Sequence, residues 1–179
     1  MGKNVLVIST SPRKGGNSER IADEFIKGAK DAGNQVEKIE LRNNTISFCR
    51  GCLACQKTQK CVINDDAVQI AEKMKNADVL AFATPIYYYE MSGQMKTMLD
   101  RANPLYSSDY SFRDIYFFSA AAEDAEGVDS RAIEGLKGWI ECFEKATLAG
   151  TVFGGGVNNI GDIEGHPSLQ EAYEMGKNV

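Results

Sequence analysis

Stretches of almost uninterrupted apolar residues recur along the chain and alternate with segments of helical periodicity. Residues 4–9 (NVLVIS), 79–84 (VLAFAT) and 115–122 (IYFFSAAA) are the clearest of these stretches. A strand that is apolar at almost every position is buried on both faces, which is typical of the central strands of a parallel sheet. This feature favours an α/β architecture, in which helices cover both faces of the sheet.

The segments between these stretches complete the alternation. Residues 35–41 and 148–153 predict two further strands. Apolar residues at helical spacing predict a first helix that ends near Gly33 and four more helices, which cover residues 67–76, 93–101, 129–146 and 167–175. Asp66 and Gln69 are expected to form a capping box for the second helix. Five strands alternating with helices predict a three-layer α/β sandwich whose five-stranded parallel sheet has the order 2-1-3-4-5. No linker or repeat divides residues 1–179, so we expect a single domain.

The composition limits which classes of molecule the protein is expected to bind. The formal net charge is −5, with 20 basic and 25 acidic side chains and no long run of Lys or Arg, which argues against a nucleic-acid partner. No apolar stretch approaches the roughly 20 residues that a membrane-spanning helix needs, and the first residues lack the pattern of a signal peptide. We therefore expect a cytoplasmic protein with neither a nucleic-acid nor a membrane partner.

The loop over residues 9–18 (STSPRKGGNS) follows the first predicted strand and leads into a helix. Ligands of open parallel sheets bind at the carboxyl ends of the strands, and the N-terminus of a helix favours an anion. Serine hydroxyls, the Asn17 amide and the Arg13 guanidinium offer donors to a phosphate, and Gly15 and Gly16 let the backbone approach closely. The loop matches neither the P-loop nor the G-x-G-x-x-G pattern, which argues against a nucleoside triphosphatase and against direct dinucleotide binding. A polar turn without a ligand is the alternative.

The loop over residues 84–93 (TPIYYYEMSG) follows the third predicted strand and reaches the same edge of the sheet. Three tyrosines and a methionine suit the face of a planar heterocycle. Tyrosine is also enriched at subunit interfaces, so these rings are alternatively interface residues of a homodimer or homotetramer. The two interpretations are compatible, because a dimer can build its site across the interface.

Together the two loops resemble the NAD(P)H-dependent FMN reductases, a family of flavodoxin-like proteins. The resemblance rests on Ser-x-Ser-Pro-Arg-x-x-x-Asn-Ser in residues 9–18, on Thr-Pro-Ile-Tyr-Tyr-Tyr-x-Met-Ser-Gly-x-x-Lys-x-x-x-Asp-Arg in residues 84–101, and on a closing segment that contains residues 161–167. It implies a flavodoxin-like fold and an enzyme that passes electrons from NAD(P)H through FMN to a quinone, azo, nitro or flavin acceptor. Because the cofactor carries this chemistry, no catalytic side chain is assigned. The rival functions are an electron carrier without nicotinamide oxidation and a binding module that has lost the flavin.

The same resemblance implies which residues bind FMN. The phosphate loop would supply Ser9, Ser11, Pro12, Arg13, Gly16, Asn17 and Ser18. One side of the isoalloxazine ring would lie against the second loop, at Pro85, Ile86, Tyr87, Tyr88, Met91, Ser92 and Gly93. The end of the fourth predicted strand would close the other side with Ser119 and Ala120.

Four of the five cysteines lie within 13 residues: Cys49, Cys52, Cys55 and Cys61. In a reducing compartment such a group indicates a metal, an iron–sulfur cluster or redox-active thiols rather than structural disulfides. The spacing C-x2-C-x2-C-x5-C resembles that of iron–sulfur flavoproteins, a branch of the same family, and this resemblance implies ligands of a [4Fe–4S] cluster. Free or redox-active thiols and a zinc site are the alternatives.

Three further residues receive structural assignments from the sequence. Cys142 is expected in the core because Trp139, Ile140 and Phe143 surround it in the sequence. His166 is expected at the surface or at an interface, and Arg101 is expected to make structural contacts at the end of its helix.

Overall fold

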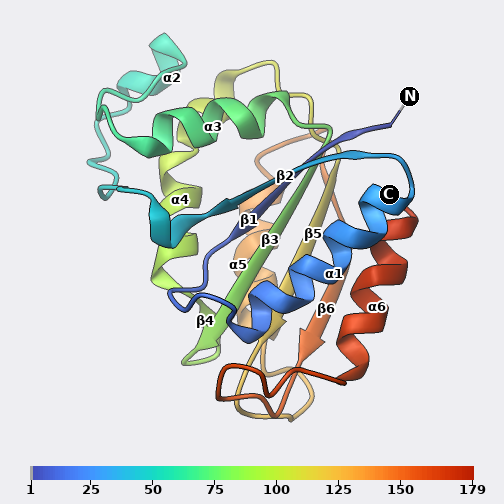
Figure 1. Ribbon diagram of the computed structural model, residues 1–179. Coiled ribbons are helices and arrows are strands. Elements are labelled where there is room, and N and C mark those ends of the chain that lie inside the picture. The colour runs from blue at the N-terminus through green and yellow to red at the C-terminus, as the bar shows by residue number, and fades with distance from the viewer. Residues whose placement is uncertain (1) are drawn as a thin grey trace.

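The computed structural model describes residues 2–179 and contains a twisted sheet between two layers of helices (Figure 1). Five parallel strands have the order β2–β1–β3–β5–β6; they are β1 (Asn4–Ser9), β2 (Gln35–Glu40), β3 (Val79–Tyr87), β5 (Asp114–Ala120) and β6 (Thr147–Gly154). Counted among the parallel strands alone, this is the predicted order 2-1-3-4-5. The reversal of strand order lies between β1 and β3, which is where flavodoxin-like sheets bind ligands.

Helices cover both faces of the sheet. One layer contains α1 (Asn17–Asp31) and α6 (Pro167–Lys177), and the other contains α3 (Asp66–Asn76), α4 (Gly93–Arg101) and α5 (Ser130–Ile140). Alternate residues of each strand face the two layers, so β1 contributes Val5 and Val7 to one core and Leu6 and Ile8 to the other. Burial of these strands on both faces explains why their sequences are almost continuously apolar.

Helices α1 and α6 approach each other closely through two glycines. A Cβ atom on Gly28 would lie 2.1 Å from the Tyr173 carbonyl oxygen, and one on Gly176 would lie 2.2 Å from the Phe25 carbonyl oxygen. No larger residue fits at either position without moving a helix. The C-terminal helix is therefore held against the helix that begins at the predicted phosphate loop.

The segment predicted as a loop over residues 85–92 is largely a β-hairpin. Strand β3 continues to Tyr87, and the short strand β4 (Glu90–Met91) pairs with its end in the antiparallel sense. Tyr88 and Tyr89 form the turn with φ angles of 52° and 67°. No residue pattern predicts this hairpin, because turns with two left-handed residues usually contain Asn, Asp or Gly. The sheet therefore has six strands rather than five.

Three local expectations are corrected. Helix α3 is capped by Asp65, whose carboxylate accepts a hydrogen bond from the Ala67 N–H (3.2 Å), and not by Asp66. Helix α5 ends at Ile140 rather than at residue 146, because the chain continues in turns with bonds from Phe143 N–H to Ile140 O and from Ala146 N–H to Phe143 O. Cys142 lies in these turns and is exposed, so it is not a core residue.

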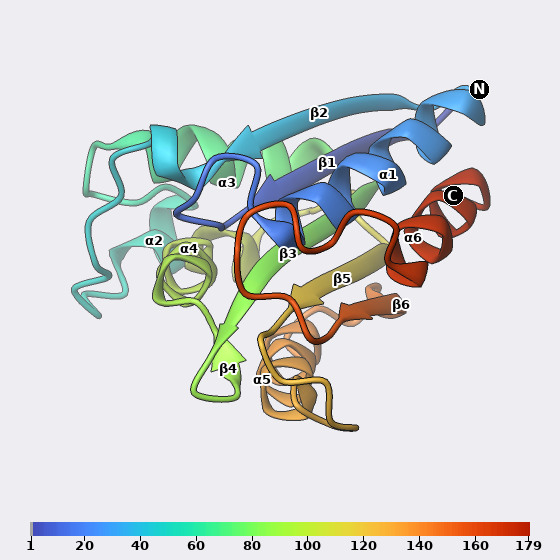
Figure 2. The same ribbon diagram turned by 60° about the horizontal axis from the view of Figure 1, so that its bottom comes forward.

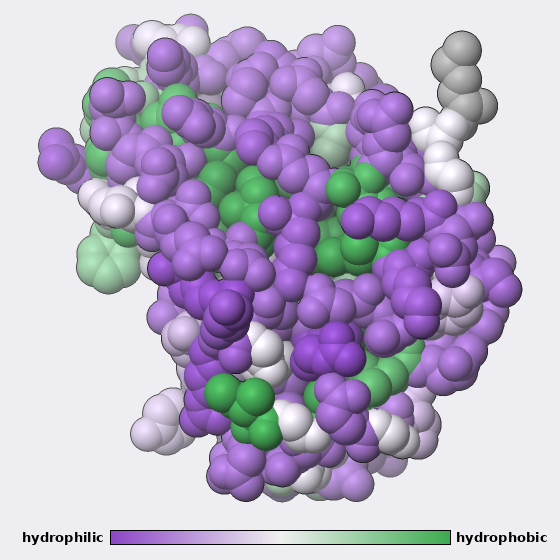
Figure 3. All heavy atoms as spheres, viewed as in Figure 1, coloured by the Kyte–Doolittle hydropathy of each residue, from purple (hydrophilic) through white to green (hydrophobic). Residues whose placement is uncertain are grey.

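Short elements complete the chain: η1 (Leu41–Asn43), α2 (Ala54–Thr58) and η2 (Asn103–Ser107). Within residues 2–179, no helix is both long and apolar enough to cross a membrane. The molecular face in Figure 1 is mainly hydrophilic, and hydrophobic atoms are visible chiefly in a hollow between α1 and α3 (Figure 3).

Candidate functional site

A cleft of about 210 Å³ lies at the carboxyl ends of β1, β3 and β5. Figure 2 shows the segments that meet there: the loop before α1, the end of β3, the segment after β5 and the loop after β6. The lining residues are Ser11, Arg13, Gly16, Asn17, Ser18, Pro85, Ile86, Tyr87, Ala120, Ala121, Ala122, Val157, Asn158 and Ile160. The two loops that the sequence singled out therefore meet at one cleft.

The structure brings together part of the predicted FMN-binding set. The predicted residues that line the cleft are Ser11, Arg13, Gly16, Asn17, Ser18, Pro85, Ile86, Tyr87 and Ala120. The other predicted residues lie elsewhere. Ser9 and Ser119 are fully buried at strand ends, Pro12 is exposed beside the cleft, and the ring of Tyr88 is almost fully exposed at the tip of the hairpin.

The last three predicted residues lie behind or beyond the hairpin. Met91 is part of the hydrophobic core, and Gly93 borders a separate cavity beside Leu41 and Phe48. Ser92 is buried and caps α4, since its Oγ accepts a hydrogen bond from the Met95 N–H (3.3 Å). Strand alternation explains these positions, because β4 turns Met91 inward.

Sequence reasoning missed the wall formed by Val157, Asn158 and Ile160. Arg13 Nη1 donates a hydrogen bond to the Asn158 carbonyl oxygen (2.8 Å), and Asn17 Nδ2 donates to the Asn159 carbonyl oxygen (2.9 Å). The loop after β6 is thereby attached to the loop before α1. The only sequence signal near this wall was the closing motif that begins at residue 161.

The Asp162 carboxylate shapes this wall. Its Oδ2 accepts hydrogen bonds from the backbone N–H groups of Asn158 (3.0 Å) and Asn159 (2.7 Å). The bonds from Asn159 and Asn158 lower the pKa of Asp162. An ionised Asp162 therefore fixes the two residues whose carbonyl oxygens bind Arg13 and Asn17.

Buried polar atoms without partners gather where the phosphate is expected. Among residues 2–179, Ser9 Oγ, Ser18 Oγ and Asn17 Oδ1 are buried and lack a hydrogen-bond partner. Helix α1 begins at Asn17 after a cap without a side-chain bond, so its first N–H groups have no acceptor within the helix. Ser18 Oγ, which lines the cleft, and the free N–H groups of α1 are donors that an anion with several oxygens would satisfy. Asn17 Oδ1 is an acceptor and would not pair with an anion. The phosphate of FMN fits this donor set.

Gly16 is required for the shape of this loop. A Cβ atom at this position would lie 2.4 Å from Ser11 Oγ. That hydroxyl donates to the Arg13 carbonyl oxygen (3.0 Å) and accepts from the Arg13 N–H (3.2 Å). Glycine therefore allows a tight turn that places Arg13 at the mouth of the cleft.

A buried carboxylate holds the same loop from behind. Glu19 accepts hydrogen bonds from the Gly15 N–H (3.2 Å), from Arg42 Nη1 (2.6 Å) and from Lys38 Nζ (2.9 Å). Burial acts to raise the pKa of Glu19, but the hydrogen bonds from Arg42 and Lys38 outweigh burial and bring the pKa to about 2. The carboxylate is therefore ionised at neutral pH and fixes the position of Gly15.

Hydroxyl groups join the two loops beneath the cleft. Thr10 Oγ1 and Ser92 Oγ lie 2.9 Å apart, and the Ser92 N–H donates to Thr84 Oγ1 (3.0 Å). All three residues are buried. This network fixes the separation between the end of β1 and the start of α4, so Ser92 supports the cleft without lining it.

The tyrosine hairpin projects beside the cleft. Tyr87 lines the cleft and is 43% exposed, whereas the Tyr89 hydroxyl donates to the Glu123 carboxylate (2.9 Å). The Arg131 guanidinium lies over the Tyr89 ring, 5.6 Å from its centroid. These contacts attach the hairpin to the segment between β5 and α5 and leave the Tyr88 ring uncovered.

The four clustered cysteines line one cavity of about 280 Å³. Cys49 and Cys52 are exposed, Cys61 is half-buried and Cys55 is buried. Two sulfur atoms accept hydrogen bonds, since Asn103 Nδ2 lies 3.1 Å from Cys55 Sγ and the Gly51 N–H donates to Cys49 Sγ (3.4 Å). In the described part of the chain, however, no three Cys, His, Asp or Glu side chains are close enough together to hold a metal ion.

Arg101 closes the base of the cysteine segment. Its fully buried guanidinium donates to both Asp65 carboxylate oxygens (2.7 Å each), to the Ser47 carbonyl oxygen (2.7 Å) and to the Ile63 carbonyl oxygen (3.2 Å). The hydrogen bond from Arg101 lowers the pKa of Asp65 to about 2. These contacts confirm the structural role expected for Arg101. His166 also has a structural contact, because its Nδ1 accepts the Ser168 N–H and caps α6.

Comparisons with known proteins extend this description. The family model of NADPH-dependent FMN reductases matches residues 3–140. An iron–sulfur flavoprotein from Methanosarcina thermophila is 27% identical over 94% of this chain and 85% of its own. The Bacillus subtilis protein YwqN, named as an NAD(P)H-dependent FMN-containing oxidoreductase, is 29% identical over 96% of this chain and 95% of its own.

A solved structure supports the fold independently. The NAD(P)H:quinone oxidoreductase from Methanothermobacter marburgensis superposes with a TM-score of 0.78 at 17% identity, covering 99% of this chain and 96% of its own. At this identity the likeness concerns the fold alone. Because the family model covers most of the chain, and because its cleft has the donors that a flavin phosphate requires, the protein belongs to the NADPH-dependent FMN reductase family of flavodoxin-like oxidoreductases.

Proposed function

We propose that this protein binds FMN in the cleft, oxidises NADH or NADPH, and passes the electrons to a small quinone, azo, nitro or flavin acceptor. The observation that carries the proposal is the buried, unpartnered hydroxyl of Ser18, which lines the cleft beside the free N-terminus of α1. Bound FMN would supply the hydride and electron transfer, so the chain needs to bind, orient and shield the cofactor.

Each wall of the cleft has a distinct task in this proposal. Ser18 and the first N–H groups of α1 would bind the phosphate, while Ser11 holds the turn through its bonds to Arg13. Arg13 would add positive charge while it stays bonded to Asn158. Pro85, Ile86 and Tyr87 would form one side of the ring pocket. The small side chains of residues 120–122 leave space for a flat ring on the opposite side.

The first experiment is a titration of the purified protein with FMN and with riboflavin, followed by flavin fluorescence. Arg13→Ala should weaken FMN binding by about 10- to 150-fold, because a charge-assisted hydrogen bond contributes roughly 1.5–3 kcal/mol. Riboflavin lacks the phosphate, so its weaker binding should not change. Lys14→Ala is the matched control, since Lys14 is exposed and lies outside the cleft.

The second experiment separates an enzyme from a carrier. The FMN-loaded protein is mixed with NADH or NADPH and a quinone, and nicotinamide oxidation is followed by absorbance. Oxidation that requires bound FMN supports the reductase. FMN binding without nicotinamide oxidation would instead identify an electron carrier, and a protein that does not bind FMN would contradict both flavin functions.

A second cofactor is favoured by one observation, the lining of a single cavity by all four clustered cysteines. We propose that these thiols bind a [4Fe–4S] cluster, as the name of the Methanosarcina relative indicates for that protein. The thiols have suitable chemistry but do not converge, so the segment would have to close around a cluster. We therefore assign no electron-transfer step to it. Such a site requires a reducing compartment, which agrees with the cytoplasmic location expected from the sequence.

Metal analysis of anaerobically purified protein decides between the alternatives. A cluster predicts about four irons per chain, which Cys52→Ser should abolish while FMN binding is retained. Cys142→Ser is the control, because Cys142 is exposed but lies outside the cysteine cavity. Zinc in place of iron would assign a zinc site, and metal-free protein after supply of iron and sulfide would assign free thiols.

A further inference from the structure

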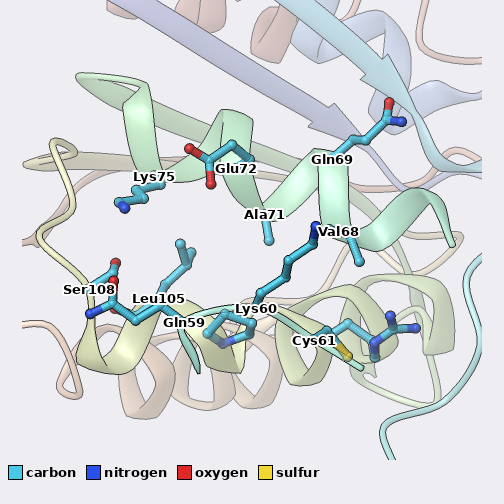
Figure 4. Close-up of a pocket in the computed structure, with 12 residues that line it drawn as sticks. Gln59, Lys60, Cys61, Val68, Gln69, Ala71, Glu72, Lys75, Leu105 and Ser108 are labelled. Carbon is cyan, nitrogen blue, oxygen red and sulfur yellow. The ribbon is translucent and has the colours of Figure 1, made fainter. Parts of the chain in front are cut away.

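A second ligand-sized cavity lies between α3, η2 and the end of the cysteine segment (Figure 4). Its volume is about 350 Å³, compared with about 210 Å³ for the cleft at the strand ends. The two share no lining residue, so this cavity is a separate site. Cys61 lines both this cavity and the cysteine cavity, so the two are neighbours.

The floor of the cavity is apolar. Ala71, Pro104 and Leu105 are buried and Val68 is half-buried. Amide and hydroxyl groups of Gln59, Gln69 and Ser108 complete the lining. An apolar surface with a few polar groups around it is typical of sites for small organic molecules, and the volume falls in the usual range of about 300–1,000 Å³.

The charged groups of the cavity favour an anion. Lys60, Lys75 and Arg101 line it together with a single carboxylate, that of Glu72. Lys60 and Lys75 have no carboxylate partner among residues 2–179, whereas Lys73 on the same helix forms an ion pair with Glu37. Because Asp65 already balances the charge of Arg101, the remaining groups have a net charge of +1. A monoanion matches this balance better than a dianion.

Figure 4 shows how these groups are arranged. The Lys60 side chain extends toward Val68 on α3, while Lys75 and Glu72 lie at one end of the cavity and Cys61 at the other. Arg101 adds a buried donor to the lining, since its Nε has no hydrogen-bond partner among the described residues. Positive groups therefore border the apolar floor from more than one side.

We propose that this cavity binds a small aromatic carboxylate or a similar planar organic monoanion. The apolar body would cover Ala71 and Leu105, and the carboxylate would pair with Lys60 and Lys75. Exposed ion pairs are weak individually, so most of the affinity would come from burial of the ring. The proposal does not depend on FMN or on a cluster, because none of the contacts that carry it involves the cleft.

The test is isothermal titration calorimetry with 2-naphthoate as the probe, on FMN-loaded and FMN-free protein. We expect one site per chain in both forms and weaker binding of the neutral analogue 2-naphthalenemethanol. The double variant Lys60→Gln/Lys75→Gln should weaken 2-naphthoate binding by about 2- to 30-fold, since each of the two pairs contributes roughly 0.2–1 kcal/mol. Lys73→Gln, on the same helix but outside the cavity, should leave the affinity unchanged.

A variant that fills the cavity tests whether 2-naphthoate binds there. Ala71→Leu places a larger side chain on the cavity floor and should abolish 2-naphthoate binding while FMN binding is retained, which shows that the variant is folded. The lysine substitutions change an exposed side chain, Lys60, and a half-buried one, Lys75, and they keep the test valid if the Ala71 variant does not fold. Three results would each overturn the proposal: no binding up to millimolar probe, unchanged affinity in folded Ala71→Leu, or displacement of 2-naphthoate by FMN.

Discussion

The cleft at the strand ends and the cysteine segment both follow the carboxyl ends of strands, yet the chain supports them very differently. Every wall of the cleft is attached to a strand end or to the first turn of α1, and the hydroxyls of Thr10, Ser92 and Thr84 fix the walls to one another. The cysteine segment instead runs from η1 to α3. Arg101 fastens its base, and its short helix α2 is attached to η2 by hydrogen bonds from Gln59 Nε2 to the Ser107 carbonyl oxygen (2.7 Å) and from Asn103 Nδ2 to Cys55 Sγ (3.1 Å).

The difference shows which kind of site a parallel sheet preorganises. Sheet topology positions a site whose contacts are backbone groups and short side chains at strand ends. It does not position four thiols on a long segment, in which Leu53 and Gln59 adopt left-handed backbone angles. The following predictions test this contrast between a preformed cleft and a segment held at its base.

The largest expected effect concerns the base of the segment. Arg101→Ala leaves the buried Asp65 carboxylate without its cation and frees the carbonyl oxygens of Ser47 and Ile63. Breaking a buried pair in this way should lower the free energy of unfolding by about 3–5 kcal/mol, measured by urea denaturation. Lys96→Ala removes an exposed pair with Asp100 on the same helix and should cost less than about 0.5 kcal/mol. Equal losses in the two variants would contradict the structural role of Arg101.

The next substitution should stabilise the FMN-free protein and weaken its binding of FMN. Ser18→Ala removes a buried hydroxyl that has no partner in the structure, so the FMN-free protein should become more stable by about 1 kcal/mol. The same change removes a phosphate donor and should weaken FMN binding by roughly 10-fold. Thermal unfolding with and without FMN measures both quantities. A variant that is destabilised and binds FMN normally would show that the cleft is not a preformed phosphate site.

A smaller effect concerns assembly through the hairpin. Tyr88 is 96% exposed beside the cleft, which is expected of a ring that a second subunit covers. We predict a homodimer or homotetramer by light scattering at micromolar concentration. Tyr88→Asn keeps a residue that tolerates the left-handed turn but removes the ring, so it should shift the mass toward the monomer. Tyr106→Ala, an exposed tyrosine on η2, is the control. A monomeric wild-type protein would reject this prediction.

The last effect is present at neutral pH and is lost in acid. The pKa of Glu19 is lowered from 4.5 to about 2, so its contribution to stability is complete above pH 4.5 and is lost as the pH falls toward 2. Glu19→Gln should therefore be less stable than the wild type at pH 7, and the difference should shrink between pH 4.5 and 2. Urea unfolding at several pH values measures it. A difference that stays constant across this range would show that the ionised carboxylate does not hold the phosphate loop.

The sequence predicted the sheet, and it singled out the loop that lines the cleft before α1, because short-range patterns encode both. Continuous apolar runs identified the central strands, and their alternation with helices determined the order. The phosphate loop was recognisable because its serines, Arg13 and the glycines are adjacent in the sequence. Such local signals need no knowledge of distant contacts.

The remainder of the cleft depends on contacts between distant residues. Asn158 lines the cleft because Arg13 and Asp162 bind its backbone. The amino-acid composition of a segment does not show which of its backbone groups distant side chains will bind. Met91 and Ser92 point inward because Tyr88 and Tyr89 form an unusual turn. The residues that support a site through hydrogen bonds were therefore harder to predict than those that border it.

The closure of the cysteine segment by Arg101 has a consequence for protein engineering. Arg101 binds the carbonyl oxygens of both Ser47 and Ile63, so the roughly 15 residues between them form a loop whose two ends are held by one side chain. Replacing them by a turn of about four residues would reduce the entropy lost on closing the loop by about 1 kcal/mol. A different peptide could be grafted at the same two points without rebuilding the sheet. The fold thus offers an insertion point at which new metal-binding or recognition sequences can be displayed within one polypeptide that also holds the flavin cleft.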